Sequence, residues 1–296
     1  MMQKIFLTIV VLLFYFSVIA QTLKDPFYIN YSLIPKNNFD SKNGYVTTKL
    51  VEINGGSPVI NIGKKFKFIN GLYYRNSIFI YSYSFSEKKL FPNNLHDIRY
   101  TAILRLQLNS KWEVIVLPRI MLRSDFNQSI NSNDFFPQVA LLAAYAIKGN
   151  PNFRIGFGVA LNNDFARNAF VPLGSLFYDS KKIKIEILFP NTHFLYKYSE
   201  NFEFGLFASV DGAILRITPF QLGSENANYL RTFQLLIAPT VSKRLYKNFF
   251  VHLKIGFVPI CNYEAMKSNF EAIQIQNYNL KSNLFLRTGI SFRFKN

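Results

Sequence analysis

Three histidines, His96, His193 and His252, are the side chains best suited to acid–base chemistry in this sequence. Hydrolytic chemistry would need a nucleophile and an orienting acid within reach of one of them. His96 directly precedes Asp97, but no nucleophile-elbow or His-x-Ser pattern accompanies any of the three. A solvated loop or a polar wall explains such lone histidines more simply. We therefore predict no catalytic residues and no enzymatic activity, with a hydrolase as the less favoured alternative.

Metal and cofactor chemistry also lacks a motif. No two histidines stand at ligand spacing, and Cys261 is the single cysteine, so we expect neither a thiolate metal site nor an intramolecular disulfide. The sequence contains no phosphate-binding loop and no dinucleotide fingerprint. We expect no metal and no cofactor.

Basic residues form the more informative pattern. The 296 residues include 34 Lys and Arg against 17 Asp and Glu, which gives a formal net charge of +17. A basic chain can bind nucleic acid, but here the charges occur singly within alternating segments and never as a block. The export signal at the N-terminus also argues against that partner, so we expect no nucleic acid.

These basic residues occupy one phase of segments that alternate between apolar and polar side chains. In residues 96–109, for example, Ile98, Tyr100 and Leu104 alternate with Arg99 and Arg105. A period of two places the two sets on opposite faces of a β-strand. The other segments repeat the arrangement, with the basic phase carrying Arg119, Arg154, Lys184, Lys254 and Arg287.

A soluble β-sandwich and a membrane barrel would both alternate in this way, with the apolar face turned inward or outward respectively. The segments are about 11 residues long, which suits a tilted strand crossing a bilayer. Aromatic residues begin four segments directly after short turns, as in an interfacial girdle. A basic residue facing lipid at mid-height costs roughly 2–4 kcal/mol. We therefore predict a membrane barrel whose lumen is lined by Arg99, Arg105, Arg119, Arg154, Lys184, Lys254 and Arg287.

Connections between the segments alternate between long and short. Long polar connections are expected at 86–95, 124–134, 164–170, 219–228 and 262–277. The pattern matches barrels with long outer loops, short periplasmic turns and an even strand number. Segments from Leu72 onward give 12 strands, and adding 45–53 and 59–69 gives 14. A hairpin is predicted at Asn70-Gly71, directly after the second of these segments. The predicted fold is all-β: a single antiparallel transmembrane β-barrel of 12–14 strands in an up-and-down meander.

The N-terminus reads as a secretory signal. Lys4 precedes an apolar core, and Val18-Ile19-Ala20 predicts cleavage before Gln21. The alternative is a retained anchor helix, but the apolar run from Ile5 to Ala20 would span only about 24 Å of a hydrocarbon core of roughly 30 Å. We expect a signal peptide at 1–20, an N-terminal periplasmic segment at 21–43, and the barrel at 44–296.

The last segment, residues 284–294, ends with Arg287, Gly289, Phe292 and Phe294. This spacing resembles the C-terminal assembly signal of bacterial outer-membrane β-barrels, with Gly289, Phe292 and Phe294 as its signal residues, although two residues follow Phe294. With segments 154–158 and 170–174, the layout resembles uncharacterised outer-membrane β-barrel proteins of Gram-negative bacteria that are grouped as a domain of unknown function. The resemblance implies placement in the cell outer membrane, contact with lipid and lipopolysaccharide, and insertion by the barrel-assembly machinery. It implies no catalytic residues.

Two functions remain open at this point. The first is a passive pore or transporter with a basic lumen, which would prefer anions because like charge raises their local concentration. The second is a plugged structural or surface-binding barrel, in which the same residues pair with acids and inward loops. On the predicted lumen faces, 11 basic residues stand against four acidic ones, Glu113, Glu186, Glu203 and Asp211.

Apolar residues on the inner phase, namely Phe207, Leu236 and Val258, also leave uptake of hydrophobic molecules open. Arg216 and Arg231 fall on the apolar phase beside predicted outer loops. They are either a rim site for lipopolysaccharide phosphates or ordinary strand-end charges, and we favour the second. The sequence identifies neither a cargo nor an oligomeric state.

Overall fold

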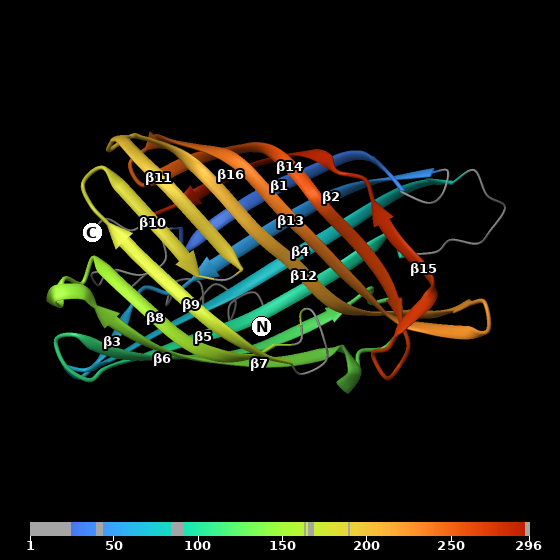
Figure 1. The fold of residues 1–296 in the computed structure, drawn as a ribbon, viewed down its shortest axis with the longest axis horizontal. Coiled ribbons are helices and arrows are strands. Elements are labelled where there is room, and N and C mark those ends of the chain that lie inside the picture. The colour runs from blue at the N-terminus through green and yellow to red at the C-terminus, as the bar shows by residue number, and fades with distance from the viewer. Residues whose placement is uncertain are drawn as a thin grey trace, which may run out of the picture.

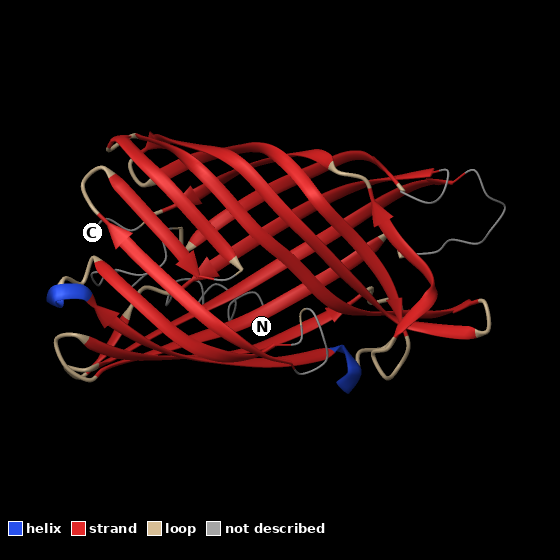
Figure 2. Ribbon diagram, viewed as in Figure 1, coloured by secondary structure: helices blue, strands red, loops and turns tan. Residues whose placement is uncertain are grey.

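The computed structural model describes residues 25–39, 44–83, 92–162, 164, 169–188 and 190–293. The expected signal peptide therefore lies outside the described residues. Within them the chain is almost entirely β-structure, with two short 3₁₀ helices, η1 (Ser132–Asp134) and η2 (Ile147–Gly149) (Figure 2). No helix in this part of the chain is long and apolar enough to cross a membrane.

Sixteen strands are present in the described residues. They are β1 (Phe27–Asn38), β2 (Gly44–Gly56), β3 (Ile60–Ile62), β4 (Phe66–Tyr83), β5 (Asn94–Gln107), β6 (Trp112–Ser124), β7 (Phe135–Ala146), β8 (Phe153–Asn162), β9 (Ala169–Asp179), β10 (Ile183–Leu188), β11 (Asn191–Ser199), β12 (Phe202–Leu222), β13 (Glu225–Tyr246), β14 (Phe249–Met266), β15 (Ala272–Leu280) and β16 (Asn283–Phe292).

The strands form a closed ring. From β4 to β14 each strand pairs antiparallel with the next, β2 pairs with both β1 and β4, and β16 pairs with both β14 and β1. The short β3 pairs only with β4, and β15 precedes β16 along the same partner, β14. Fourteen strands therefore make up the ring among the described residues (Figure 1). The predicted antiparallel meander is confirmed, at the upper end of its strand count.

The N-terminal boundary of the barrel needs correction. Residues 21–43 were expected to form a periplasmic segment, but Phe27–Asn38 is strand β1 and pairs with β2 and β16. The pairing of Phe27 with Phe292 brings the first and last strands together and closes the ring. Weak alternation hid this strand in the sequence, because its inward face carries the small polar residues Ser32 and Asn37.

The predicted hairpin at Asn70-Gly71 is also wrong. Both residues lie within β4, which runs on for 18 residues and pairs with β5 along much of its length. The turn instead falls at residues 63–65, where Gly63 has a φ of +67°. Glycine adopts this left-handed conformation without strain, which suits Gly63 to the turn. At Asn70-Gly71, pairing with β5 overrides the local turn preference of the two residues. Predicted outer loops at 219–228 and 262–277 are likewise largely strand, in β12 to β15.

Apolar side chains cover the outside of the ring. On β8, Ile155, Phe157 and Val159 are exposed, and Phe157 retains 63% of its accessible surface. The alternate residues Gly156 and Gly158 are only partly exposed. Aromatic pairs gather near the end of the ring that holds the short turns: Trp112–Tyr145, Phe153–Tyr178 and Phe249–Phe292. An apolar outer belt with aromatic rings at its border is the surface of a transmembrane β-barrel.

The two ends of the barrel differ in their connections. Short turns such as 200–201 and 247–248 gather at the end where β16 finishes, and we call this the short-turn end. The opposite, long-loop end carries the segment 125–134 and the β12–β13 hairpin, which projects beyond the other strands (Figure 1).

Candidate functional site: the interior of the barrel

An ion pair crosses the interior at mid-height. Arg75 on β4 makes two parallel contacts with Asp211 on β12, Nη1 to Oδ1 at 2.9 Å and Nη2 to Oδ2 at 2.8 Å. Five strands separate β4 from β12 along one side of the ring and seven along the other. A round ring of 14 tilted strands would be about 28 Å wide, far more than these two side chains span together. The barrel is therefore flattened here, and its two walls meet through this pair.

Glu52 on β2 joins a second cation to the same layer. Its Oε1 accepts hydrogen bonds from Arg75 Nη2 at 3.1 Å and from the Tyr73 hydroxyl at 2.6 Å. Its Oε2 lies 3.6 Å from Nη2 of Arg287, and Arg287 Nε donates to Ser32 Oγ at 2.7 Å. We call Glu52, Tyr73, Arg75, Asp211 and Arg287 the mid-barrel layer.

Asp97 on β5 organises a neighbouring group of arginines. It accepts hydrogen bonds from Arg99 Nε at 2.9 Å and from Arg123 Nε at 3.1 Å. Arg123 on β6 has no exposed surface, and its Nη2 also lies 2.7 Å from Asp164 Oδ1. A buried guanidinium is tolerated only when carboxylates offset its lost hydration, and here two carboxylates contact it.

A third group lies nearer the short-turn end. Arg105 on β5 donates from Nε and Nη2 to the two oxygens of Glu113 on β6, both at 2.7 Å. Arg154 Nη1 on β8 reaches Glu113 Oε2 at 3.4 Å, and Lys184 Nζ on β10 lies 2.8 Å from Glu186 Oε1. Every cation named in this group therefore has an acidic partner.

Arg119 on β6 differs from these arginines. Its Nε donates to Thr101 Oγ1 at 3.1 Å, and its Nη1 reaches Gln138 Oε1 at 3.5 Å. Gln138 Nε2 in turn reaches Asn162 Oδ1 at 3.5 Å. No carboxylate of a described residue lies within ion-pair distance of the Arg119 guanidinium. Its hydrogen bonds go to neutral groups, and Asp164 and Asp97 act on its charge only from farther away.

Lys254 on β14 lies over an aromatic ring. Its Nζ is 3.7 Å from the ring centre of Phe207 on β12, and Arg287 approaches the same ring at 5.9 Å. Phe207 is buried. These contacts place two of the predicted basic residues inside the ring.

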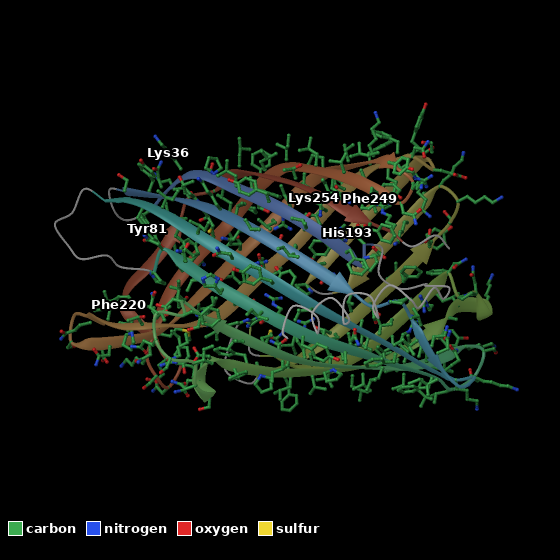
Figure 3. All side chains as sticks on the ribbon, turned by 180° about the vertical axis from the view of Figure 1, so that it is seen from behind. Lys36, Tyr81, His193, Phe220, Phe249 and Lys254 are labelled. Carbon is green, nitrogen blue, oxygen red and sulfur yellow. The ribbon has the colours of Figure 1, made fainter. Side chains whose placement is uncertain are left out.

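The interior of the long-loop half is apolar. Buried residues of β1, β2, β4, β5 and β12–β16 form one continuous cluster that includes Phe79, Leu95, Leu215 and Tyr263 and reaches as far as Phe207. Tyr81 and Phe220 pack against it and mark this half in Figure 3, whereas Lys254 lies in the other half. We call this cluster the apolar plug.

A small cavity separates the apolar plug from the mid-barrel layer. It is lined by Arg75, Asp97 and Asp211 on one side and by Phe79, Leu215 and other residues on the other. Its volume of about 20 Å³ holds roughly one water molecule. This cavity itself has no room for a solute larger than water.

The short-turn end holds a separate polar group. Arg293 donates to Asp25 Oδ1 at 2.7 Å and to Glu203 Oε2 at 3.1 Å. His252 Nδ1 lies 2.8 Å from Ser242 Oγ, and its Nε2 contacts Ser291, whose hydroxyl donates to Asp25 at 2.8 Å. These contacts tie the start of the barrel to its last strand.

The three histidines are far apart in the described structure. His96 Nδ1 lies 3.0 Å from the Tyr74 hydroxyl, and His193 packs 5.0 Å from the Phe207 ring. His252 lies between two serines, but the acid, Asp25, contacts Ser291 and stays 4.0 Å from the imidazole. The described residues contain no group of His, Cys, Asp or Glu that could hold a metal ion, and Cys261 is buried without a disulfide.

The predicted lumen residues do not form one site. The structure places Arg99, Arg105, Arg154, Lys184 and Arg287 each beside a carboxylate, Lys254 over Phe207, and Arg119 among neutral groups. Sequence reasoning missed Arg75, Glu52, Asp97 and Asp25. Asp97 shares the phase of Arg99 and could have been assigned from it. Aromatic residues flank Arg75 and obscured its phase, and Asp25 directly precedes β1, which was not assigned to the barrel.

The two arginines on the apolar phase each have an acidic partner. Arg216 Nη1 lies 2.8 Å from Asp134 Oδ2, and Arg231 contacts Glu264 on the adjacent β14. Both charges are therefore offset within the protein.

The C-terminal signal residues fall in and beyond β16. Phe292 packs edge-to-face against Phe27 and Phe249. A Cβ on Gly289 would lie 2.0 Å from Asn30 Oδ1, so this position has no room for a side chain. Phe294 lies outside the described residues.

Comparison with known proteins is informative at the level of family. Residues 19–293 match a family model described as Domain of unknown function (DUF6268). The chain belongs to this family. No curated protein matches the chain.

Three solved structures similar to this DUF6268 chain are a porin, an outer membrane channel and an autotransporter domain. The first is the NanC porin, with 7% identity, 90% of this chain and 100% of that chain covered, and a TM-score of 0.37. The COG4313 outer membrane channel from Pseudomonas putida F1 has 11% identity, coverage of 93% and 97%, and a TM-score of 0.45. The β domain of the Bordetella autotransporter BrkA has 7% identity, coverage of 91% and 99%, and a TM-score of 0.27. These likenesses are too distant to bear on function.

Proposed function

We propose that this DUF6268 protein is an outer-membrane β-barrel whose bore is sealed, and that it is not an open diffusion pore. The exposed apolar belt and its aromatic border support the membrane placement. The short-turn end then faces the periplasm. The observation that carries the sealed bore is the bidentate contact of Arg75 with Asp211 between walls that are not neighbours.

Two further layers support the seal. The apolar plug fills the long-loop half, and the cavity beneath it holds roughly one water molecule. Opening a bore would expose the buried apolar surface of the plug to water, at about 25 cal/mol per Å². The sealed state is therefore strongly favoured over an axial aqueous path.

The balance of charge in the interior also weighs against an anion pore. Five acidic residues contact interior cations in addition to the four expected from the sequence: Asp25, Glu52, Asp97, Asp164 and Asp179. Paired charges create little net potential along a bore. The geometry therefore supports the plugged barrel over the passive pore with a basic lumen.

Planar-bilayer conductance of the purified full chain tests this proposal. We expect no steady open level for the wild-type protein. Asp211→Asn should add at most brief openings of the bore, because the apolar plug stays in place. Lys267→Gln, in an outer turn, serves as a control and should behave like the wild-type protein. A steady ohmic conductance of the wild-type protein would refute the sealed bore, and a reversal potential favouring anions would restore the basic pore.

We also infer that lipid and lipopolysaccharide surround the barrel and that the barrel-assembly machinery inserts it through its last strand. Phe292 supports this inference because its ring lies among Phe27 and Phe249 at the seam of the barrel. Phe292→Ala should lower the amount of protein in the outer membrane of cells while the purified chain still folds in detergent. Unchanged cellular levels would count against a signal at this position.

A further inference from the structure

The wall of the barrel is interrupted on one side. Strands β10 and β11 have only six and nine residues, and the pairing of β9 with β10 ends at Ser175. The pairing of β11 with β12 ends at Ser209, apart from a bond from Val210 N to Pro190 O. Figure 1 shows the β10–β11 hairpin ending partway along the barrel while β9 and β12 continue.

Above this hairpin, β9 and β12 have no strand between them among the described residues. Ala169–Gly174 of β9 pairs with β8 alone, and β12 has no strand partner on that side between Val210 and its bridge with β6 at Arg216. We call this interruption the lateral break. Strand edges facing lipid leave backbone groups unpaired, and membranes tolerate such edges only beside protein or a water-filled space.

Apolar side chains border the lateral break. Gly174, on the outer phase of β9, is exposed there. Leu188 lies on the inner phase at the hairpin end but keeps 44% of its surface exposed, and Phe170 on the outer phase keeps 76%. The inner-phase residues Val171 and Leu173 are half-buried. The border of the break is therefore apolar and accessible from the side.

Behind the break, β12 turns away from the outer surface. Ile214 lies on the phase of β12 that faces lipid lower down, yet it is fully buried with Met121 of β6 and Phe136 of β7. Arg216 then forms a parallel bridge with Ser124 at the end of β6. The upper part of β12 thus lies against the inner sides of β6 and β7, and the break leads toward those inner sides.

Arg119 belongs to a row of laterally neighbouring residues that crosses β6, β7, β8 and β9 and ends at the lateral break. Arg119 pairs with Gln138 and Asn162 pairs with Ala169, while a side-chain hydrogen bond joins Gln138 to Asn162. Ala169 is the first residue of the unpaired β9 edge. Three strand spacings, or about 14 Å, separate this edge from the backbone of Arg119, whose guanidinium makes no ion pair with a described residue.

We propose that the lateral break and Arg119 together bind a fatty carboxylate. The carboxylate would accept hydrogen bonds from Arg119, a bidentate match for a planar guanidinium. The acyl chain would extend past Val171 and Leu173 to the break and into the surrounding hydrocarbon. Arg119 makes no ion pair with a described residue, and one guanidinium suits one negative charge, which favours a carboxylate over a more highly charged lipid phosphate. This site rests on the membrane placement of the barrel but not on the sealed bore.

Isothermal titration of hexadecanoate into the purified full chain in detergent tests the proposal. Arg119→Gln should weaken binding about tenfold or more, because it removes a charge-assisted hydrogen bond to the carboxylate. Lys197→Gln, which removes an interior cation near the short-turn end, should leave binding unchanged. 1-Hexadecanol should bind at least about tenfold more weakly than hexadecanoate.

Two neighbouring substitutions test the path of the acyl chain. Leu173→Trp places a large ring on the inner phase and should reduce binding, whereas Gly174→Trp places it on the lipid side and should not. Circular dichroism establishes that each variant is folded. Wild-type affinity in Arg119→Gln, equal binding of the alcohol, or tighter binding of phosphatidic acid than of hexadecanoate would each overturn the proposal. Binding is measured at equilibrium, so a conducting barrel would not by itself contradict it.

Discussion

The ammonium group of Lys254 lies 3.7 Å from the ring centre of Phe207, although Lys254 is on β14 and Phe207 is on β12. Strand β13 lies between them in the ring. The contact therefore forms through the interior and not along one strand pair. A cation over an aromatic face contributes about 0.5–2 kcal/mol, with the larger value when water is excluded.

A double-mutant cycle on Lys254→Met and Phe207→Leu measures this contact. We expect a coupling free energy of about 1–2 kcal/mol, because both side chains point into the barrel and away from its outer surface. Urea unfolding in lipid vesicles, followed by circular dichroism, gives the four free energies. Strictly additive effects would show that the two residues do not interact.

The Arg105–Glu113 pair should respond asymmetrically to substitution. Both side chains are buried, so Arg105→Gln leaves the buried Glu113 carboxylate with only the more distant Arg154, and should cost up to about 3–5 kcal/mol of unfolding free energy. Arg105→Gln combined with Glu113→Gln should cost less than Arg105→Gln alone. The same unfolding measurement checks this order, and a larger loss in the double variant would contradict it.

Gly205 lies where two strands approach closely. A Cβ at this position would stand 1.9 Å from the carbonyl oxygen of Phe194, whereas a Cβ at Gly174 would meet nothing within 4 Å. Gly205→Ala should therefore reduce unfolding free energy by about 1–3 kcal/mol or block folding, and Gly174→Ala should be neutral. The folded fraction recovered from urea compares them; equal recovery would mean that β11 and β12 are farther apart than described.

A charge on the outer belt should be expensive only at mid-height. Leu206 is exposed on β12 and Leu245 is exposed near the short-turn end of β13. Leu206→Arg should cost about 2–4 kcal/mol in lipid vesicles and Leu245→Arg about 0–1 kcal/mol. Equal costs at the two positions would indicate that no hydrocarbon layer surrounds the ring.

The sequence predicts the wall of this barrel well because each wall residue faces one of two very different environments. Alternation in β8, with Ile155 and Phe157 opposite Arg154 and Gly156, follows directly from that contrast. The Asn70-Gly71 prediction failed because a local turn preference of this kind yields to pairing with β5 along most of β4. Strand β1 was missed because its inward polar residues resemble a loop.

The interior could not be predicted in the same way. Arg75 and Asp211 meet because the ring is flattened. No local sequence pattern encodes the distance between two strands that have five others between them in the ring. The excess of basic over acidic residues was overestimated. Glu52 lies in a segment whose inward phase was not assigned, and Asp97, which shares the phase of Arg99, was left out of the acidic residues. The lateral break depends on the short length of β10 and β11, which appears in the sequence only as a tight Pro190-Asn191 connection.

Tryptophan fluorescence tests the central claim, that the apolar face meets lipid while the interior is sealed. Trp112 is the only tryptophan, so a Trp112→Phe background accepts single reporters, Leu206→Trp on the outer face and Phe207→Trp in the interior. In lipid vesicles we predict strong quenching at 206 by lipids brominated in mid-chain, and little quenching at 207 by either brominated lipid or aqueous iodide. Strong iodide quenching at 207, or bromine quenching at 207 instead of 206, would contradict the account.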